Sequence, residues 1–381
     1  MGQGSDVLFA LVVAGATVAG CSSDHPPAER PRPRAPDTAA LDRYFRGQFA
    51  ADEPGGAVLV SRNDQVVFSG AYGLADLRTR EPVTTRTLFN VGSITKTFVA
   101  NAILILQEEG KLSVDDGLSK YFELKHPEVA ARVSLRHLLT HTSGLPDARE
   151  VDENPSFFLT AKDEENWFPI TQVDALEFEP GSRSHYSNPA FNGLALIVQK
   201  TSGQRWQSFV RDRIFLPSGM KTSTITDGPH PSTGVAHGYT RVNGDWVEQD
   251  YGEVPTFAAA GNGGVWSSVD ELALYERAIR RATFLSRAAI ADSRTVKTFA
   301  NWTAPEPPMF GWAWMIERPE GVLHVGHTGT QGGFHSIYVT IPDQEIFYVV
   351  LASSPRDREA FAAEIEQWLR RQGWLEAEPG R

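Results

Sequence analysis

The feature that most constrains the fold is a segment, residues 89–110, that begins as a polar loop and becomes apolar on almost every side. A helix that is apolar all round is stable only when other elements cover it, so it lies at the centre of a molecule. The chain has 381 residues, of which 41% are hydrophobic and 22% are charged, so it has enough apolar material to surround such a helix. The sequence therefore predicts a folded globular body built around this segment.

Predicted strands lie towards both ends of the chain. Residues 56–72 have a hairpin pattern that turns at Asn63-Asp64, and residues 335–353 have a second one that turns at Pro342-Asp343. Helical patterns and long polar loops dominate the region between them. We expect an α/β fold in which an antiparallel sheet of N- and C-terminal strands is flanked by helices. Its α/β part is expected at about residues 39–111 and 261–375, and an inserted, mostly helical domain at about residues 112–260.

The N-terminal segment predicts export and lipid attachment. The apolar run from Val7 to Ala19 is shorter than the roughly 20 residues that span a membrane, and it is typical of a signal-peptide core. Cys21 follows in the pattern Val-Ala-Gly-Cys of bacterial lipoprotein signal peptides, and as the only cysteine it has no internal disulfide partner. We expect a periplasmic lipoprotein, anchored by acyl chains on Cys21 in the outer rather than the inner membrane. The alternative is a chance apolar segment.

These signals divide the chain into three parts. We expect a lipoprotein signal peptide at residues 1–21, a Pro-rich linker at residues 22–38 and a folded domain at residues 39–375. The prolines and charges of the linker favour an extended, solvated chain.

The charge balance, the histidines and the glycines exclude several functional classes. The formal net charge is −11, and no basic cluster offsets it locally, so we expect no nucleic-acid partner. The ten histidines include no His-Glu-x-x-His motif and no zinc-like spacing, and the glycines form neither a dinucleotide fingerprint nor a Walker loop. We therefore expect no metal and no organic cofactor.

The start of the apolar helix carries the first candidates for catalysis, Ser93 and Lys96. Residues three apart share one face of a helix, and a helix N-terminus favours a developing negative charge. A partly desolvated lysine there can be neutral and accept the serine proton. The structural alternative is a capping serine beside a solvated lysine. A second Ser-x-x-Lys match, Ser218 and Lys221, is boxed by a proline and a glycine as at a helix end, so we interpret it as structural.

Two further motifs follow in the order of a known family. Tyr186-x-Asn188 lies in the middle of the chain, and His327-Thr328-Gly329 lies just before the C-terminal hairpin. With these motifs and supporting segments such as LLTHTSGL at residues 138–145, the chain resembles the serine β-lactamase and penicillin-binding protein superfamily over most of residues 41–370. The branch it resembles is that of class C β-lactamases, D,D-peptidases and esterases. The resemblance implies a β-lactamase-like fold.

The resemblance assigns a role to each motif. It implies that Ser93 is the acylating nucleophile, that Lys96 is its general base and that Tyr186 moves protons to and from Ser93 and the leaving group. It implies that the backbone N–H groups of Ser93 and Thr330 form the oxyanion hole. The substrate-binding residues that it implies are Asn188, His327, Thr328 and Gly329. Acyl transfer needs a nucleophile, a base, an acid and an oxyanion site, and the motifs supply all four.

One departure from the family bears on the substrate. Class C β-lactamases usually carry Lys at the first position of the third motif, where this chain has His327. Because an imidazole titrates near neutral pH, we expect a weaker, pH-dependent anchor for a substrate carboxylate. We expect a serine hydrolase that forms an acyl-enzyme, foremost a D,D-carboxypeptidase or D-peptidase-like enzyme acting on peptidoglycan-type peptides. The alternatives are a carboxylesterase or weak β-lactamase, and a protein that binds penicillins or cell-wall peptides without turnover.

Two remaining features have simpler interpretations. His141 and Ser143 suggest a second Ser/His pair, but the resemblance makes their segment a structural support near the site. The chain contains no Gly-x-Ser-x-Gly elbow, which argues against a Ser-His-Asp hydrolase. We expect the loop at residues 149–171 to overhang the cleft and to set specificity.

Overall fold

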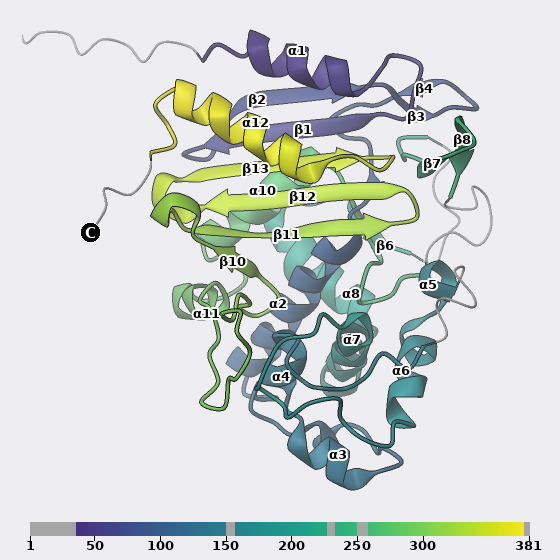
Figure 1. The fold of residues 1–381 in the computed structure, drawn as a ribbon, viewed down its shortest axis with the longest axis vertical. Helices are drawn as coiled ribbons and strands as arrows, with labels where there is room; N and C mark the ends of the chain where they lie inside the picture. The colour runs from purple at the N-terminus through teal and green to yellow at the C-terminus, as the bar shows by residue number, and fades with distance from the viewer. Residues whose placement is uncertain (1–35, 150–156, 227–232, 250–257, 377–381) are drawn as a thin grey trace, which may run out of the picture. The chain divides into compact units, whose positions relative to one another are not determined.

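The computed structural model describes residues 36–149, 157–226, 233–249 and 258–376. Residues Asp37–Arg381 form one compact unit (Figure 1). Cys21, the expected signal peptide and most of the expected linker lie outside the described residues, as do residues 150–156 of the loop expected to overhang the cleft. None of the helices within the described ranges has the length and apolar character needed to cross a bilayer.

The unit alternates helices and strands along the chain. The helices are α1 (Ala39–Gln48), α2 (Thr95–Glu108), α3 (Pro127–Arg132), α4 (Leu135–Leu139), α5 (Phe157–Thr160), α6 (Asp163–Thr171), α7 (Asn188–Ser202), α8 (Trp206–Val210), α9 (Leu216–Ser218), α10 (Val269–Arg280), α11 (Arg287–Ser293) and α12 (Arg358–Arg371). The strands are β1 (Gly56–Arg62), β2 (Gln65–Tyr72), β3 (Leu74–Asp76), β4 (Glu81–Pro82), β5 (Phe89–Asn90), β6 (Thr224–Ile225), β7 (Tyr239–Val242), β8 (Asp245–Glu248), β9 (Val265–Ser267), β10 (Met315–Glu317), β11 (His324–Gln331), β12 (Phe334–Ile341) and β13 (Ile346–Ala352). Short helical turns are η1 (Gly92–Ile94), η2 (Leu118–Lys120), η3 (Arg211–Phe215), η4 (Pro319–Gly321) and η5 (Pro342–Gln344).

The central sheet joins the two ends of the folded unit. Its strands lie in the order β10-β11-β12-β13-β1-β2, and each neighbouring pair is antiparallel. The β1–β2 hairpin turns through Asn63 and Asp64, which both have positive φ, as a tight hairpin turn requires. β12 and β13 form the second expected hairpin, and β1 pairs with β13 with Val58 opposite Val350. The prediction that N- and C-terminal strands share one antiparallel sheet is confirmed.

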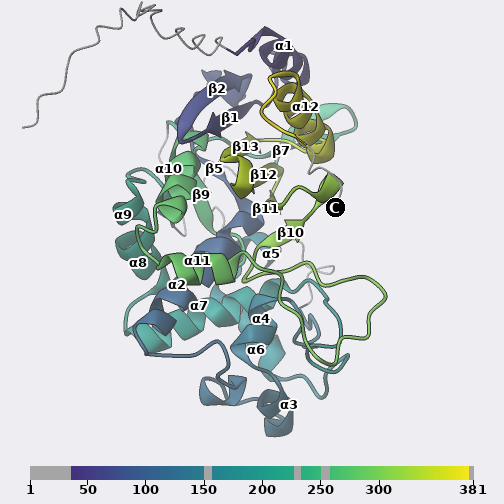
Figure 2. The same ribbon diagram turned by 90° about the vertical axis from the view of Figure 1, so that its left-hand side faces the viewer.

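Helices cover both faces of this sheet, because successive side chains of a strand point to opposite sides. Val58 and Val350 belong to an apolar cluster with residues of α1 and α12, which lie in front of the sheet in Figure 1. Ala57 and Leu351 belong to a second, larger cluster that includes residues of α2 and α10. Figure 2 shows α10 on the side of the sheet opposite to α12. The predicted α/β class with flanking helices is confirmed.

Helix α2 lies at the centre of the unit, as its apolar sequence predicts. Every residue from Thr95 to Leu106 is buried, and α2 packs against α7 of the helical region. The stretch expected to be mostly helical, residues 112–260, contains α3 to α9 but also short strands. There, β6 pairs with β9, and β7 and β8 form a hairpin. The pairing of β6 with β9 links the helical region back to the α/β part.

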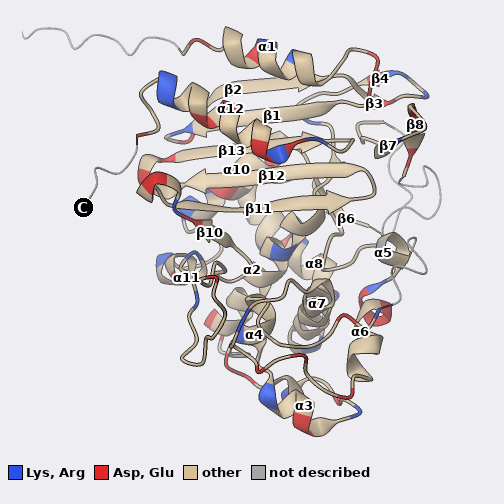
Figure 3. Ribbon diagram, viewed as in Figure 1, with Lys and Arg blue, Asp and Glu red and all other residues tan. Residues whose placement is uncertain are grey.

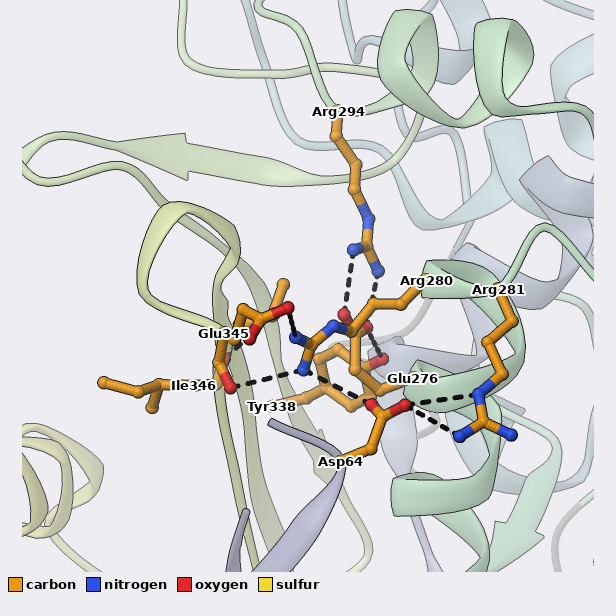
Figure 4. Close-up of polar contacts among 9 residues, drawn as sticks. Asp64, Glu276, Arg280, Arg281, Arg294, Tyr338, Glu345 and Ile346 are labelled. Atoms are coloured by element: carbon orange, nitrogen blue, oxygen red, sulfur yellow. Dashed lines mark hydrogen bonds and ion pairs between the residues drawn. The ribbon is translucent and has the colours of Figure 1, made fainter. Parts of the chain in front are cut away.

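Charged side chains are spread over helices and turns, whereas the central strands carry few of them (Figure 3). One ionic group, however, is buried between α10 and the sheet (Figure 4). The Glu276 carboxylate on α10 accepts two hydrogen bonds from Arg294, at 2.9 and 2.6 Å, and one from the Tyr338 hydroxyl on β12, at 2.5 Å. Asp64, from the β1–β2 turn, pairs with Arg280 in the same view. These contacts tie α10 to both hairpins of the sheet.

Candidate active site

The N-terminus of α2 brings the two residues of the first motif together. Ser93 lies in the 3-10 turn η1, and Lys96 lies in the first turn of α2. The Lys96 Nζ is 2.9 Å from the Ser93 Oγ. Ser93 is partly exposed, whereas Lys96 is fully buried. The hydroxyl is therefore within reach of a substrate, and the amine behind it is shielded from water.

Three oxygen atoms surround the Lys96 amine. Besides the Ser93 hydroxyl, they are the Asn188 Oδ1 at 2.9 Å and the backbone carbonyl of Asn262 at 2.7 Å. None of the three is a carboxylate, and burial together with the positive charge of Arg149 holds the pKa of Lys96 well below its usual range. The neutral amine is thus favoured. It has two N–H groups and one lone pair, so donation to Asn188 and Asn262 leaves the lone pair for the Ser93 hydroxyl.

Tyr186 meets the same two groups from the segment before α7. Its ring centroid is 5.1 Å from the Lys96 Nζ, and its hydroxyl is hydrogen-bonded to the Ser93 side chain. Burial of the hydroxyl raises the pKa of Tyr186, and the hydrogen bond with Ser93 opposes this rise. The residue is 40% exposed, and its ring stacks on His141 with the centroids 4.2 Å apart. The structure therefore brings Ser93, Lys96 and Tyr186 into one constellation.

His141 acts as a support for this constellation in the structure. It has a positive φ of 58°, and its Nδ1 accepts a hydrogen bond from the Ser187 N–H at 3.0 Å. Burial and the nearby Lys96 charge lower the pKa of His141 well below its usual value. Ser143 turns away from it, and its hydroxyl accepts a hydrogen bond from the Leu145 N–H at 3.3 Å. These contacts fit the interpretation of the segment as a structural support.

His327 lies on β11 as a buried, neutral imidazole. Its Nδ1 is 2.5 Å from the Thr328 carbonyl, and because a carbonyl only accepts, this nitrogen carries the proton. Burial and the Lys96 charge lower the pKa of His327 to about 3. The expectation that His327 is an anchor that titrates near neutral pH is therefore wrong, since its desolvated site opposes the charged form. Among the described residues, its Nε2 has no hydrogen-bond partner.

The backbone of β11 meets the turn η1 beside Ser93. Gly92 has a φ of +54°, and a Cβ at this position would lie 2.7 Å from the Thr330 nitrogen. A Cβ at Gly329 would lie 2.1 Å from the Val91 carbonyl oxygen. Glycine is required at both positions, because any other residue would separate the two backbones. The contact places the Thr330 peptide next to the Gly92–Ser93 peptide, where the two N–H groups of an oxyanion hole are expected.

Three groups at the site were not identified from the sequence. Asn262 contributes a backbone carbonyl, which every residue has, so no residue type could indicate it. Arg149 is buried and lowers the pKa of Lys96 across a sequence separation that gives no periodic signal. Arg358, at the start of α12, donates to the Gly329 carbonyl at 2.9 Å and to the Thr330 Oγ1 at 2.8 Å. An arginine in the first turn of a helix has no pattern that distinguishes it from a solvated one.

The second Ser-x-x-Lys match lies outside this constellation. Ser218 is the last residue of α9, and Gly219 follows it with a left-handed φ of 83°. The Ser218 hydroxyl is buried without a hydrogen-bond partner in the described part of the chain, and Lys221 is exposed. The interpretation of this match as a helix end is confirmed. Over the ranges that the structure describes, no group of His, Cys, Asp and Glu side chains is arranged to hold a metal ion.

Sequence comparisons agree with this geometry. The Beta-lactamase family profile matches residues 41–371. Penicillin-binding protein 4* of Bacillus subtilis is 27% identical over 325 residues, which cover 80% of this chain and 69% of that protein. D-aminopeptidase of Brucella suis biovar 1 is 26% identical over 318 residues, which cover 82% of this chain. The match spans 57% of the length of that D-aminopeptidase.

Solved structures share the same architecture. The octameric penicillin-binding protein homologue from Pyrococcus abyssi superposes with a TM-score of 0.77 and 26% identity, over 88% of this chain and 77% of that one. D-amino acid amidase from Ochrobactrum anthropi SV3 superposes with a TM-score of 0.72 over 87% of this chain and 97% of that one, and at 21% identity it shares the fold. Since the profile spans almost the whole folded unit and the three motifs meet in one place, the chain belongs to the Beta-lactamase family.

Proposed function

We propose that this protein is a serine hydrolase that forms an acyl-enzyme on Ser93 and acts foremost on D-amino-acid peptides. The observation that carries the proposal is the Lys96 amine, which is buried, lacks a carboxylate partner among its three contacts and lies 2.9 Å from the Ser93 Oγ. Such an amine is suited to accept a proton and poorly suited to a purely structural ion pair.

The proposed reaction uses the groups in a fixed order. Ser93 attacks the scissile carbonyl while its proton passes to Lys96, and the N–H groups of Ser93 and Thr330 stabilise the oxyanion, each worth about 3 kcal/mol. Tyr186 then donates a proton to the leaving amine or alcohol. In the second half, Tyr186 accepts a proton from water, which attacks the ester and releases Ser93. Asn188 serves both steps, because its Oδ1 holds Lys96 and it lies where the substrate docks.

The choice of D-peptides rests on two supports. The relatives named above include a penicillin-binding protein, a D-aminopeptidase and a D-amino acid amidase. Within the chain, the neutral His327 leaves Arg358 as the side chain that brings permanent positive charge to β11. A guanidinium at this strand is suited to attract a substrate carboxylate, as a D,D-carboxypeptidase needs. Thr328 and Gly329 supply the strand along which the peptide would lie.

Intact-mass spectrometry and product analysis test the proposal. The wild-type protein is incubated with a D-alanyl-D-alanine peptide, a D-amino acid amide, p-nitrophenyl acetate and penicillin. We expect turnover of the D-substrates and an adduct on Ser93, both lost in Ser93→Ala and retained in the matched control Ser218→Ala. Fast ester turnover without peptide cleavage would favour a carboxylesterase, and stable adducts with every substrate would favour a binding protein. Loss of activity in Ser218→Ala alone would overturn the site.

We also propose that the chain is a periplasmic lipoprotein anchored through Cys21. The support is the apolar run that ends in Val-Ala-Gly-Cys, followed by a charged Pro-rich spacer. Metabolic labelling with a palmitate analogue in a bacterial host should mark the wild-type protein and not Cys21→Ala. Label that persists in Cys21→Ala would refute the anchor and would leave the proposed chemistry untouched.

A further inference from the structure

A buried carboxylate that the proposed reaction does not use lies close to its base. Asp163, the first residue of α6, is 4% exposed and accepts three hydrogen bonds. The Asn192 Nδ2 at 2.8 Å and the Gly261 N–H at 2.7 Å donate to its Oδ1, and the Trp206 Nε1 at 2.7 Å donates to its Oδ2. All three partners are neutral N–H groups. They belong to three different parts of the chain: α7, the loop before β9, and α8.

The first of these bonds leads to the Asn262 carbonyl. Gly261, whose N–H is held by Asp163, directly precedes Asn262, whose carbonyl accepts the Lys96 hydrogen bond at 2.7 Å. The loop is packed tightly at this point, because a Cβ at Gly261 would lie 2.6 Å from the Phe191 carbonyl oxygen. The peptide therefore has little freedom to shift without losing its bond to Asp163.

The second bond leads to the other acceptor of Lys96. Asn192 lies one helical turn after Asn188 on α7, so the two amides share one face of the helix. Asn188 accepts from Lys96 at 2.9 Å, while Asn192 donates to Asp163 and lies 3.3 Å from the Asn262 side-chain oxygen. Asp163 thus contacts, through one intermediate each, both oxygens that receive the two N–H groups of the neutral amine.

We propose that Asp163 is a positioning residue: it fixes the Asn262 carbonyl and the Asn188 amide as the two acceptors of Lys96, and so directs the lone pair of the amine at Ser93. The inference rests on the proposed function, in which Lys96 is the base. It assigns Asp163 no contact with substrate and no proton transfer in the reaction.

The charge state of Asp163 fits this role. Burial raises the pKa of Asp163 to about 7, the Glu164 charge raises it further, and the three N–H donors oppose the rise. From α7, α8 and the Gly261 loop only neutral groups face the carboxylate. A protonated carboxyl would place an O–H among three converging donors, so the ionised form suits the site.

The test compares two buried carboxylates that hold backbone amides. Asp163→Asn is compared with Glu271→Gln, because Glu271 accepts the N–H groups of Thr222 and Ser223, at 2.8 and 2.6 Å, without contacting Lys96. The readouts are the melting temperature, kcat and KM, and the rate of Ser93 phosphonylation by a fluorophosphonate between pH 5 and 10. We expect Asp163→Asn to lower the alkaline plateau of this rate about 10- to 100-fold with KM within about twofold, as misplacement of a catalytic group does. Glu271→Gln should lower the melting temperature alone.

A rescue variant separates positioning from folding. Trp206→Phe removes the Oδ2 donor and keeps both Oδ1 bonds, so the plateau rate should stay near that of the wild type. Added to Asp163→Asn, it frees the amide to turn its oxygen to Gly261 and Asn192, and the rate should recover at least about threefold. If Asp163→Asn does not fold, Asn192→Ala takes its place, with the same expected fall in the plateau.

Each outcome decides the inference. A wild-type plateau in Asp163→Asn, in Asn192→Ala where that replaces it, or an equal rate loss in Glu271→Gln would overturn the positioning role. A melting temperature that falls with no change in rate would do the same. Labelling that survives Ser93→Ala would instead contradict the proposed function, so the two failures are distinct.

Discussion

Among single residues, Lys96 has the surroundings that most restrict its chemistry. A lysine is ordinarily charged, but a fully buried amine without a carboxylate partner is more stable when neutral. Its three contacts are all oxygens, and two of them, on Asn188 and Asn262, can only accept from it. The third, the Ser93 hydroxyl, is the group that can give it a proton. The direction of proton transfer therefore follows from which atoms surround the amine.

Replacing Lys96 by arginine separates charge from basicity. A guanidinium stays protonated at every accessible pH, so Lys96→Arg keeps a donor near Ser93 but removes the proton acceptor. We expect the rate of Ser93 phosphonylation to fall by about 10²- to 10⁴-fold, the usual contribution of a general base. Lys221→Arg, at the exposed second match, should leave the rate unchanged. An unaltered rate in Lys96→Arg would exclude Lys96 as the base.

How much of the site the sequence could predict depends on the kind of interaction. Ser93 and Lys96 are three residues apart on one helix, so their contact follows from helix geometry. Tyr186 lies about 90 positions away, and only the resemblance to a family joins it to them. Asn262 could not be found, because a carbonyl is common to all residues. Asp163 could not be found either, because an aspartate in a first helical turn is usually a solvated one.

Among the secondary-structure elements, the contact between η1 and β11 controls the expected oxyanion site. Gly92→Ala would force a Cβ to within 2.7 Å of the Thr330 nitrogen and strain a positive φ. We expect kcat to fall by about 10²- to 10³-fold with little change in KM, as on loss of an oxyanion donor. Gly110→Ala is the matched control, since Gly110 also has positive φ, at 68°, but a Cβ there meets nothing within 4 Å.

The control distinguishes strain from displacement. Gly110→Ala should cost about 1 kcal/mol of stability and leave kcat unchanged, because its strain is local. If both variants lose stability equally and neither loses kcat, the junction of η1 and β11 does not position the oxyanion donors.

The buried ion pair behind the sheet gives a prediction on stability. Arg294 and Glu276 are 9% and 2% exposed, and Glu276 also accepts from Tyr338, which pairs across the sheet with His327. Arg294→Met would leave a buried carboxylate without its cation, so the free energy of unfolding should fall by about 3–5 kcal/mol. Urea denaturation measures this. Adding Glu276→Gln should recover part of the loss, and a double variant less stable than Arg294→Met would contradict the account.

The elements differ in how well local sequence predicts them. The hairpin at Asn63-Asp64 was predictable because its turn requires positive φ, which these residue types tolerate. The short strands β6 to β8 were not, because two to four residues carry too little periodicity and their pairing depends on distant partners. The central helix α2 was predictable, since its burial is written in its all-round apolar composition.

Across the whole molecule, buried histidines link stability to pH. Burial lowers the pKa of His141 well below its usual value and that of His327 to about 3. In the unfolded chain both titrate near about 6.5. As pH falls below that value, the unfolded state binds protons that the folded state does not, so the free energy of unfolding decreases, by up to about 1.4 kcal/mol per pH unit for each group. The folded state should lose stability well above the pH at which its carboxylates titrate.

His141→Asn tests this coupling at one site. Asparagine tolerates the positive φ of 58° at this position, and its side-chain oxygen can replace the Nδ1 as acceptor for the Ser187 N–H. Between pH 6.5 and 4.5 the free energy of unfolding of the variant should decrease less steeply than that of the wild type, by up to about 1.4 kcal/mol per pH unit. Equal slopes in the two proteins, measured by urea denaturation, would show that His141 is protonated in the folded state.

His324 provides a control of opposite sign. Burial works against its charged form, but the hydrogen bonds to Glu366 and to the Val322 carbonyl raise the pKa of His324 overall. The folded state therefore holds this proton more tightly than the unfolded state, so the stabilisation is present at low pH and is lost as pH rises through the folded-state pKa. His324→Asn should accordingly steepen the decrease in stability towards acid, where His141→Asn flattens it. Changes of the same sign in both variants would mean that lost packing, and not proton binding, governs the pH response.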